Sequence, residues 1–267
     1  MIPDDTKQSS GPMKVFKIGG NVVDNPEALD RFLRDFVRIQ GPKALVHGGG
    51  KEATRLSAAL GIPTIMKEGR RVTSRETLDV VTMVYAGLIN KRVVSKLQAL
   101  GCDAIGLSGA DGNCIRAVRR PAAPVDYGFV GDINPDNIDS RFILSLIKDG
   151  CVPVFCAITH DGAGTLLNCN ADSVASSVAM AMSREVATDL IFCFEKDGVL
   201  GNVDDPDSLV EHINPEIYVS LKEKGVVSDG MIPKIDNAFK AIERGVESVS
   251  IKHSDNILNH RGTTISR

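Results

Sequence analysis

Two glycine-rich segments, each following a short apolar run, are the parts of this 267-residue sequence best suited to bind an anion. The first reads 17-KIGGN-21 and the second 47-HGGGK-51. Ordering consecutive glycines is entropically costly, which indicates that something approaches the backbone closely there. Lys17 precedes the first glycine pair by two residues, where its ammonium group could neutralise a phosphate beside free N–H groups. The pattern predicts a phosphate site, although either segment could also be an ordinary tight turn.

Neither segment has the spacing of the common nucleotide loops. The Walker A loop needs Gly, four residues and then Gly-Lys-Ser/Thr, and the dinucleotide fingerprint needs Gly-x-Gly-x-x-Gly. The five histidines form no His-x-x-x-His pair and the six cysteines no Cys-x-x-Cys pair. P-loop enzymes, Rossmann dehydrogenases and zinc hydrolases are therefore disfavoured, and no metal-ligating residues are predicted. Cysteines within apolar runs are interpreted as buried hydrophobic residues of a reduced, cytoplasmic protein.

Composition and charge exclude several kinds of partner. The chain is 43% hydrophobic and 24% charged, with a formal net charge of -3 and no basic block. Nucleic acid is therefore not an expected partner. No apolar run approaches the roughly 18 residues of a membrane span, so no membrane partner is expected either. Residues 1–12 are polar and without periodicity, which favours a disordered leader before Met13.

Expected strands and helices alternate along the rest of the chain and must position these segments. Apolar strands are expected at 14–20, 43–50, 103–107, 113–118, 151–158, 188–194 and 246–251. Helices are expected at 25–39, 51–60, 75–99, 135–148, 171–184, 214–224 and 232–244. A hairpin that turns at Glu68-Gly69 is expected over 64–73. This alternation predicts an α/β fold with a mostly parallel sheet between helices on both faces. Both glycine segments then lie at carboxyl ends of strands, where such folds bind anions.

The expected helix 75–99 is apolar on two faces. The first consists of Leu78, Val81, Tyr85 and Leu88, and the second of Val80, Met83, Val84 and Gly87. A helix that is apolar on two sides usually packs against two partners, here its own sheet and a second subunit. We therefore expect a homodimer with this helix at its interface.

Five motifs in order along the chain together resemble the amino acid kinase family. They are Lys-x-Gly-Gly at 17–20, His-Gly-Gly-Gly at 47–50, Gly-Arg-Arg-Val-Thr at 69–73, Asn-Cys-Asn-Ala-Asp at 168–172 and Asp-Gly-Met-Ile-Pro-Lys at 229–234. The resemblance covers nearly the whole chain after Met13. It implies a three-layer αβα sandwich around a mostly parallel central sheet. An N-terminal amino-acid-binding lobe would span 13–170 and a C-terminal nucleotide-binding lobe 171–267.

The resemblance also implies an activity. Within the family, the motifs are most similar to those of members that use ATP with Mg²⁺ to phosphorylate the side-chain carboxylate of an N-acylated glutamate, in arginine and ornithine biosynthesis. The product is an acyl phosphate. Lys17 and Lys234 would be the two cations that stabilise the transferring group, and Asp172 would hold both lysines. An Asp at a helix start is equally typical of a helix cap.

The remaining roles implied by the resemblance fall on two sides of the site. On the amino-acid side, Gly49 and Gly50 would face the reacting carboxylate, where a β-carbon would block its approach. Arg71 would grip the α-carboxylate through a bidentate fork, and Asn168 would bind the acyl amide. On the nucleotide side, the contacts would come from Gly19, Gly20, Glu195, Gly198, Ser228 and Gly230.

Departures from the family pattern lie at 194–196, where Phe194 stands in place of the usual hydroxyl residue, Glu195 in place of aspartate and Lys196 in place of valine. They keep open a non-catalytic small-molecule sensor on the same scaffold. Another amino-acid kinase or carbamate kinase of this fold is a second alternative. The acyl group also stays open between acetyl and a larger group such as succinyl.

Overall fold

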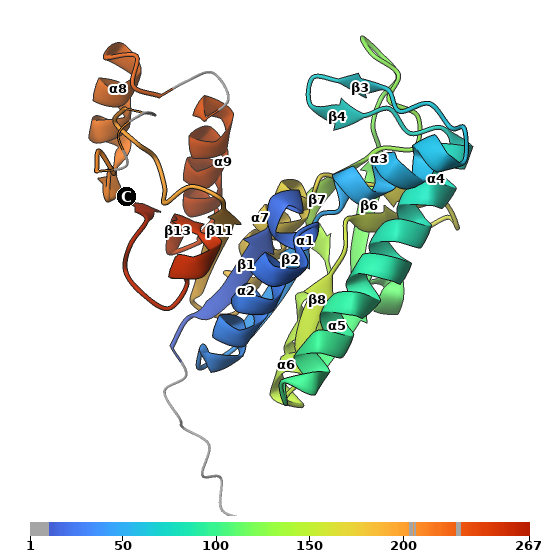
Figure 1. Cartoon of the computed structure of the whole chain (residues 1–267), viewed down its shortest axis with the longest axis horizontal. Helices are drawn as coiled ribbons and strands as arrows, with labels where there is room; N and C mark the ends of the chain where they lie inside the picture. The colour runs from blue at the N-terminus through green and yellow to red at the C-terminus, as the bar shows by residue number, and fades with distance from the viewer. Residues whose placement is uncertain (1–10, 203–204, 206, 228–230) are drawn as a thin grey trace, which may run out of the picture.

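One continuous sheet of eight strands runs through the computed structural model of the chain (Figure 1). The structure describes residues 11–202, 205, 207–227 and 231–267, so most of the predicted leader lies outside the described residues. The order across the sheet is β12 (His212–Ile213), β14 (Thr263–Ile265), β13 (Ser248–His253), β11 (Thr188–Phe194), β1 (Met13–Ile18), β2 (Lys43–His47), β8 (Val152–Phe155) and β5 (Ala104–Leu107). Neighbours are parallel except β13 and β14, which confirms the predicted mostly parallel sheet.

Helices cover both faces of this sheet and complete the predicted three-layer αβα arrangement. Helices α2 (Pro26–Arg38) and α5 (Asn90–Ala99) pack against each other on one face (Figure 1). The other face carries α6 (Ser140–Lys148), α7 (Ala171–Met182) and α9 (Ile232–Glu243). Right-handed crossovers explain this division. The connections that contain α2 and α5 advance along the sheet in one direction, and those that contain α6, α7 and α9 advance in the other. Helix α8 (Pro215–Glu223) contacts β12 at the sheet's edge.

Helix α2 illustrates how local sequence sets an element. The side chain of Asn25 caps its first turn by accepting the N–H groups of Glu27 and Ala28. At its other end, the ammonium group of buried Lys43 donates to the carbonyl oxygens of Phe36 at 2.9 Å and Ile39 at 2.6 Å. A cation at a helix carboxyl terminus satisfies free carbonyl groups and complements the helix dipole.

A four-stranded second sheet and a short hairpin lie beyond the large sheet. The second sheet has the order β10 (Leu166–Asn168), β9 (Ile158–His160), β6 (Ile115–Arg119) and β7 (Gly131–Ile138). The hairpin pairs β3 (Met66–Lys67) with β4 (Arg70–Arg71). Its turn residues Glu68 and Gly69 have φ of 49° and 72°, as a two-residue hairpin turn requires, so this prediction is confirmed.

The expected helix 75–99 is one continuous helical run, but its two predicted apolar faces were wrong. It consists of α4 (Arg75–Thr82), the π-helical segment η1 (Met83–Ile89) and α5. Residues of both predicted faces are buried together, namely Leu78, Val80, Val81, Val84 and Tyr85. Met83 and Leu88 are instead 53% and 43% exposed. The wider turn of a π-helix changes which residues share a face, and a 3.6-residue period does not anticipate it.

Two further boundaries differ from expectation. The expected helix 135–148 begins only at Ser140, because the preceding residues continue β7, which pairs with β6 across a β-bulge. Asp139 caps the helix by accepting the N–H of Phe142 at 3.0 Å. The expected strand 151–158 is divided between β8 and β9. The sequence analysis did not predict the short elements α1 (Gly20–Val23), η2 (Asp111–Asn113), η3 (Ser254–Asn256), β10, β12 and β14.

Candidate active site

The candidate site lies where three neighbouring parallel strands end side by side. Ile18 at the end of β1 is in register with His47 of β2 on one side and with Cys193 of β11 on the other. Both glycine segments therefore leave the sheet at the same edge, as the sequence predicts. The carboxyl edge of a parallel sheet is where α/β folds bind their ligands.

An upstream cavity of about 200 Å³ opens beside the second glycine segment, and all its lining residues lie within 48–171. It gathers the four predicted substrate-binding residues, which come from distant parts of the chain. Gly49 precedes and Gly50 begins α3 (Gly50–Ala59), Arg71 belongs to β4, and Asn168 ends β10.

Arg71 is a buried arginine whose guanidinium group is held by the protein. One terminal nitrogen, Nη2, donates to the carbonyl oxygen of Gly50 at 2.9 Å and to Oγ1 of Thr54 at 2.8 Å, and the other, Nη1, donates to Thr64 Oγ1 at 3.2 Å. A guanidinium group carries five N–H donors, so donors remain for a ligand. Both N–H groups of Nη2 are used in these bonds, so the two remaining donors lie on Nε and Nη1, on different edges of the guanidinium group. They can each donate to a ligand in the cavity, but this arrangement leaves no parallel pair for the predicted bidentate fork.

Asn168 is also buried and fixed in the upstream cavity. Its Nδ2 donates to Thr73 Oγ1 at 3.0 Å, and that hydroxyl donates to the carbonyl oxygen of Arg71 at 2.9 Å. The predicted carboxylate-binding and amide-binding residues therefore belong to one hydrogen-bonded chain.

Protein packing gives a further reason for glycine at position 49. A β-carbon on Gly49 would lie 2.3 Å from Ile89 Cδ1 and 3.0 Å from Tyr85 Cδ1, so side chains of the helix η1 leave too little space for it. A β-carbon on Gly50 would instead lie 4.0 Å from Arg71 Nη2, an ordinary contact beside the cavity. Protein packing alone is therefore enough to disfavour a β-carbon at Gly49, and its predicted contact with the ligand stays a prediction.

A downstream cavity of about 310 Å³ is lined by residues of 194–251, including the predicted Glu195 and Gly198. Apolar residues form much of its wall, among them Val199, Leu200, Val227, Met231 and Ile251. Gly198 lies against β14, where an added β-carbon would be 2.5 Å from Thr263 Oγ1 and 2.9 Å from Thr263 N. Ser228 and Gly230, also predicted to contact nucleotide, lie outside the described residues.

A central cavity of about 490 Å³ adjoins the other two. It shares Arg70 and Asn170 with the upstream cavity, and Phe194, Lys234 and Ile251 with the downstream cavity. Asp172 lines it as well. The three cavities therefore adjoin through shared lining residues, with Arg71 in the upstream cavity and Glu195 in the downstream cavity.

Of the predicted catalytic residues, Asp172 and Lys234 line this central cavity, and Lys17 contacts two of its lining residues, Asp172 and Phe194. Buried Lys17 forms an ion pair with Asp172, 2.7 Å between Nζ and Oδ1. Asp172 does not cap its own helix, because Asn170 accepts the first N–H groups of α7. The Lys17 and Lys234 ammonium groups lie 5.3 Å and 4.3 Å from the centre of the Phe194 ring. The structure pairs Asp172 with Lys17 and brings Lys234 to the same place.

Gly19 and Gly20 do not line these three cavities. Gly19 precedes α1 and lies close to the lysine, since a β-carbon there would be 3.7 Å from Lys17 Nζ. Gly20 begins α1, and a β-carbon on it would lie 3.2 Å from Asp24 Oδ2. In the described part of the chain, no group of three or more His, Cys, Asp or Glu side chains could hold a metal ion.

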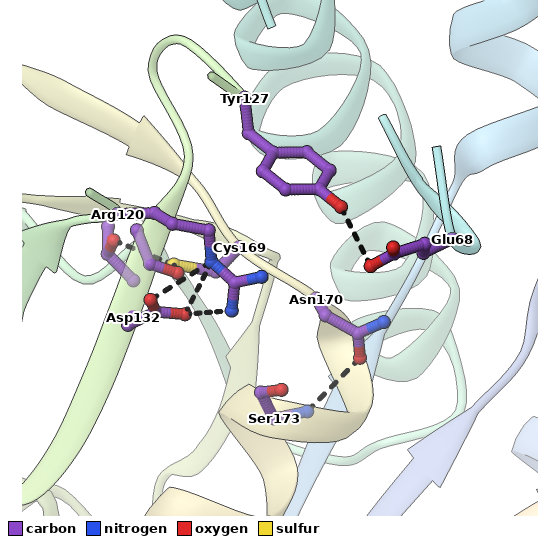
Figure 2. A network of polar contacts seen from close by, with 9 residues as sticks. Glu68, Arg120, Tyr127, Asp132, Cys169, Asn170 and Ser173 are labelled. Carbon is purple, nitrogen blue, oxygen red and sulfur yellow. Dashed lines mark hydrogen bonds and ion pairs between the residues drawn. The ribbon is translucent and has the colours of Figure 1, made fainter. Parts of the chain in front are cut away.

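A polar network beside the cavities holds residues that the motifs did not reveal (Figure 2). Tyr127 donates its hydroxyl to Glu68 Oε2 at 3.2 Å and so ties the hairpin tip to the body of the protein. Arg120 pairs with Asp132, with Nε 3.0 Å from Oδ2. Arg70 lines both the upstream and the central cavity. The only sequence signal for Arg70 was its position beside Arg71, and Tyr127 carried none.

The fold defines the class of protein first. The structure superposes on that of carbamate kinase from Giardia with a TM-score of 0.70, 14% identity, and coverage of 96% of this chain and 99% of that one. At this identity the likeness shows the fold alone. The structure of smu.665 from Streptococcus mutans is more similar in sequence, at 29% identity, with a TM-score of 0.77 and coverage of 95% and 98%.

Sequence comparison then identifies the family. The profile of the amino acid kinase family matches residues 12–253, and the chain belongs to that family. An acetylglutamate kinase from Cytophaga hutchinsonii is 50% identical over 245 residues, which are 91% of this chain and 92% of the relative. The resemblance inferred from the five motifs is therefore confirmed.

Proposed function

We propose that this protein is an acylglutamate kinase, which transfers the γ-phosphoryl group of ATP to the side-chain carboxylate of N-acetyl-L-glutamate or a close analogue. The relatives at 47–50% identity that carry the name acetylglutamate kinase support this activity over the other kinases of the fold. The observation that carries it is the set of three adjoining cavities: Arg71 lines the upstream one, Glu195 lines the downstream one, and both lysines lie over the Phe194 ring that lines the central one.

The chemistry demands positioning and charge neutralisation. A carboxylate oxygen of the acceptor attacks the γ-phosphorus, the bond to the β–γ bridging oxygen breaks, and ADP leaves. Both reactants are anionic, and negative charge spreads over the oxygens of the transferring group. We assign Lys17 and Lys234 to that charge, and Asp172 to holding Lys17. Cations fixed at the place where charge develops lower the barrier.

The two ends of the site are assigned to the two substrates. Arg71 binds the α-carboxylate, Asn168 the acyl amide, and the backbone at Gly49 and Gly50 the reacting carboxylate. ATP, with Mg²⁺ carried as its complex, lies in the downstream cavity. This places amino-acid binding in a lobe spanning 13–170 and nucleotide binding in one spanning 171–267, with Gly19, Gly20, Gly198, Ser228 and Gly230 as backbone contacts.

Assembly and location complete the proposal. We place the protein in the cytoplasm as a homodimer that buries Met83 and Leu88 of the helix η1. In the described part of the chain, no helix is long and apolar enough to cross a membrane. Light scattering should give twice the chain mass for the native protein and the chain mass for a Met83→Glu/Leu88→Glu variant. A native monomer would contradict the dimer.

Acyl-phosphate trapping tests the function. The protein is incubated with Mg·ATP and hydroxylamine, and with N-acetylglutamate, N-succinylglutamate, glutamate or aspartate in turn. We expect hydroxamate only from an N-acylated glutamate, and the better acceptor identifies the acyl group. Folded protein that yields no hydroxamate across the panel would contradict the proposed function and would favour the sensor alternative.

A further inference from the structure

Phe194 occupies a position shared by the central and downstream cavities, with two ammonium groups around its ring. It ends β11, next to β1, which carries Lys17. Lys234 reaches the same ring from the first turn of α9. The ring is stacked on Phe192 at a centroid distance of 6.1 Å and an interplanar angle of 17°. One aromatic side chain, itself supported by a second, therefore contacts both lysines.

The two lysines differ in what else holds them. Lys17 has the carboxylate of Asp172 at 2.7 Å. For Lys234, the described residues provide neither an ion pair nor a hydrogen bond to its ammonium group, and the Phe194 ring at 4.3 Å is the attraction the structure records. Two like charges gathered at one place repel each other, so some group must offset that cost.

An aromatic ring suits this task better than another polar side chain would. The negative face of the ring attracts a cation through its quadrupole, by about 0.5–2 kcal/mol depending on exposure. It accepts no conventional hydrogen bond and adds no net charge, so the ammonium protons stay available for a ligand. A second carboxylate would hold the lysines more strongly but would cancel positive charge that an anionic ligand needs.

We propose that Phe194 is a positioning residue that holds Lys17 and Lys234 through the π face of its ring. This inference rests on the proposed function, in which the two lysines neutralise the transferring phosphoryl group. Phe194, which departs from the family pattern, then has a role in organising the site. The aromatic character of the side chain, more than its bulk, determines nucleotide affinity and turnover.

Fluorinated phenylalanines separate the two properties, because successive fluorination weakens the quadrupole of the ring while nearly preserving its shape. Phe194 is replaced by mono-, di-, tri- and pentafluorophenylalanine through nonsense suppression in the full chain. We expect the Kd for Mg·ATP to rise and kcat to fall stepwise, by about 10-fold in total across the series. The same series at Phe239 is the matched control, since that ring packs on Tyr218 and, among the described residues, no lysine lies over it.

One aromatic and one aliphatic variant of Phe194 extend the test. Phe194→Tyr should keep kcat within about 2-fold, whereas Phe194→Leu should lose about 10-fold or more at an unchanged melting temperature. Equal activity and affinity across the fluorinated series, or equal losses at Phe194 and Phe239, would overturn the proposal. The Kd for Mg·ATP, measured by calorimetry, tests the proposal independently of turnover. A native protein that forms no acyl phosphate would refute the proposed function, while the affinity series would still decide the role of Phe194.

Discussion

At the scale of single residues, Arg71 shows how hydrogen bonds to the protein fix the orientation of a charged side chain. Its hydrogen bonds to Gly50, Thr54 and Thr64 fix the plane of the guanidinium group before any ligand arrives. The directions of the remaining Nε and Nη1 donors depend on that plane, and a lysine cannot reproduce them because its ammonium group is a point charge.

Arg71→Lys should therefore weaken binding of the acceptor more than it slows the chemistry. We expect KM for the N-acylated glutamate to rise about 10- to 100-fold, from the loss of about 1.5–3 kcal/mol of charged hydrogen bonding, with kcat changed little. Steady-state kinetics measure both. Arg55→Lys is the control, since Arg55 lies exposed on α3 and pairs with Glu52. A fall in kcat at constant KM would contradict the assignment.

Residue types in the five motifs were sufficient to predict most of the candidate site. Gly49, Gly50, Arg71 and Asn168 do line one cavity. The sequence did not reveal that Thr54, Thr64 and Thr73 hold them, although Thr73 belongs to the third motif, because contacts between side chains leave no local pattern. Phe194 was recognised only as a departure, since the geometry that gives its ring two cations comes from packing.

At the scale of elements, the π-helical segment η1 explains the second glycine segment. Tyr85 and Ile89 pack against the start of α3 so closely that position 49 has no room for a β-carbon. The sequence predicted a helix over 75–99 but not this wider turn. The packing requirement for glycine at position 49 was therefore not expected from the sequence.

Gly49→Ala tests this account through a double-mutant cycle. The added methyl group should lower the free energy of unfolding by about 1–3 kcal/mol. Ile89→Val removes Cδ1, the atom that would lie 2.3 Å away, and costs about 0.5–1.5 kcal/mol alone. In the Ile89→Val background, Gly49→Ala should cost clearly less. Urea unfolding measures all four proteins, and strictly additive effects would contradict the packing explanation.

At the scale of the whole molecule, one sheet of eight strands makes the strands that carry Lys17 and Phe194 neighbours near its centre. Strand periodicity and the parallel arrangement were predictable, because buried parallel strands are continuously apolar. The second sheet was less predictable from the sequence. Its short strands β9 and β10 pair antiparallel across a tight loop, and their identity depends on partners distant in sequence.

The core also imposes a pH dependence on stability. His47 is fully buried, with Nδ1 2.8 Å from Gly48 O and Nε2 3.1 Å from Asn90 Nδ2, and burial lowers its pKa to about 4. The folded protein holds this imidazole neutral, while the unfolded chain protonates it below about pH 6.5. The folded state therefore loses stability as the pH falls from about 6.5 to 4, by up to about 3 kcal/mol from this residue.

Urea unfolding between pH 7.5 and 5 measures this loss. The decrease should be smaller in a His47→Gln variant and unchanged in His212→Gln, which alters an exposed histidine. An unfolding free energy that is equally sensitive to pH in the native and His47→Gln proteins would show that another group is responsible.

The most direct test of phosphoryl transfer by paired lysines is the kinetics of Lys234→Met in the hydroxamate assay. Lys148→Met, which alters an exposed lysine of α6, is the control. Loss of one charge-stabilising group should lower kcat by about 10²–10³, or roughly 3–4 kcal/mol. KM for ATP should rise as well, while KM for the acceptor should stay within a few-fold of native. The control should match the native protein. A Lys234→Met enzyme with native kcat would contradict the account.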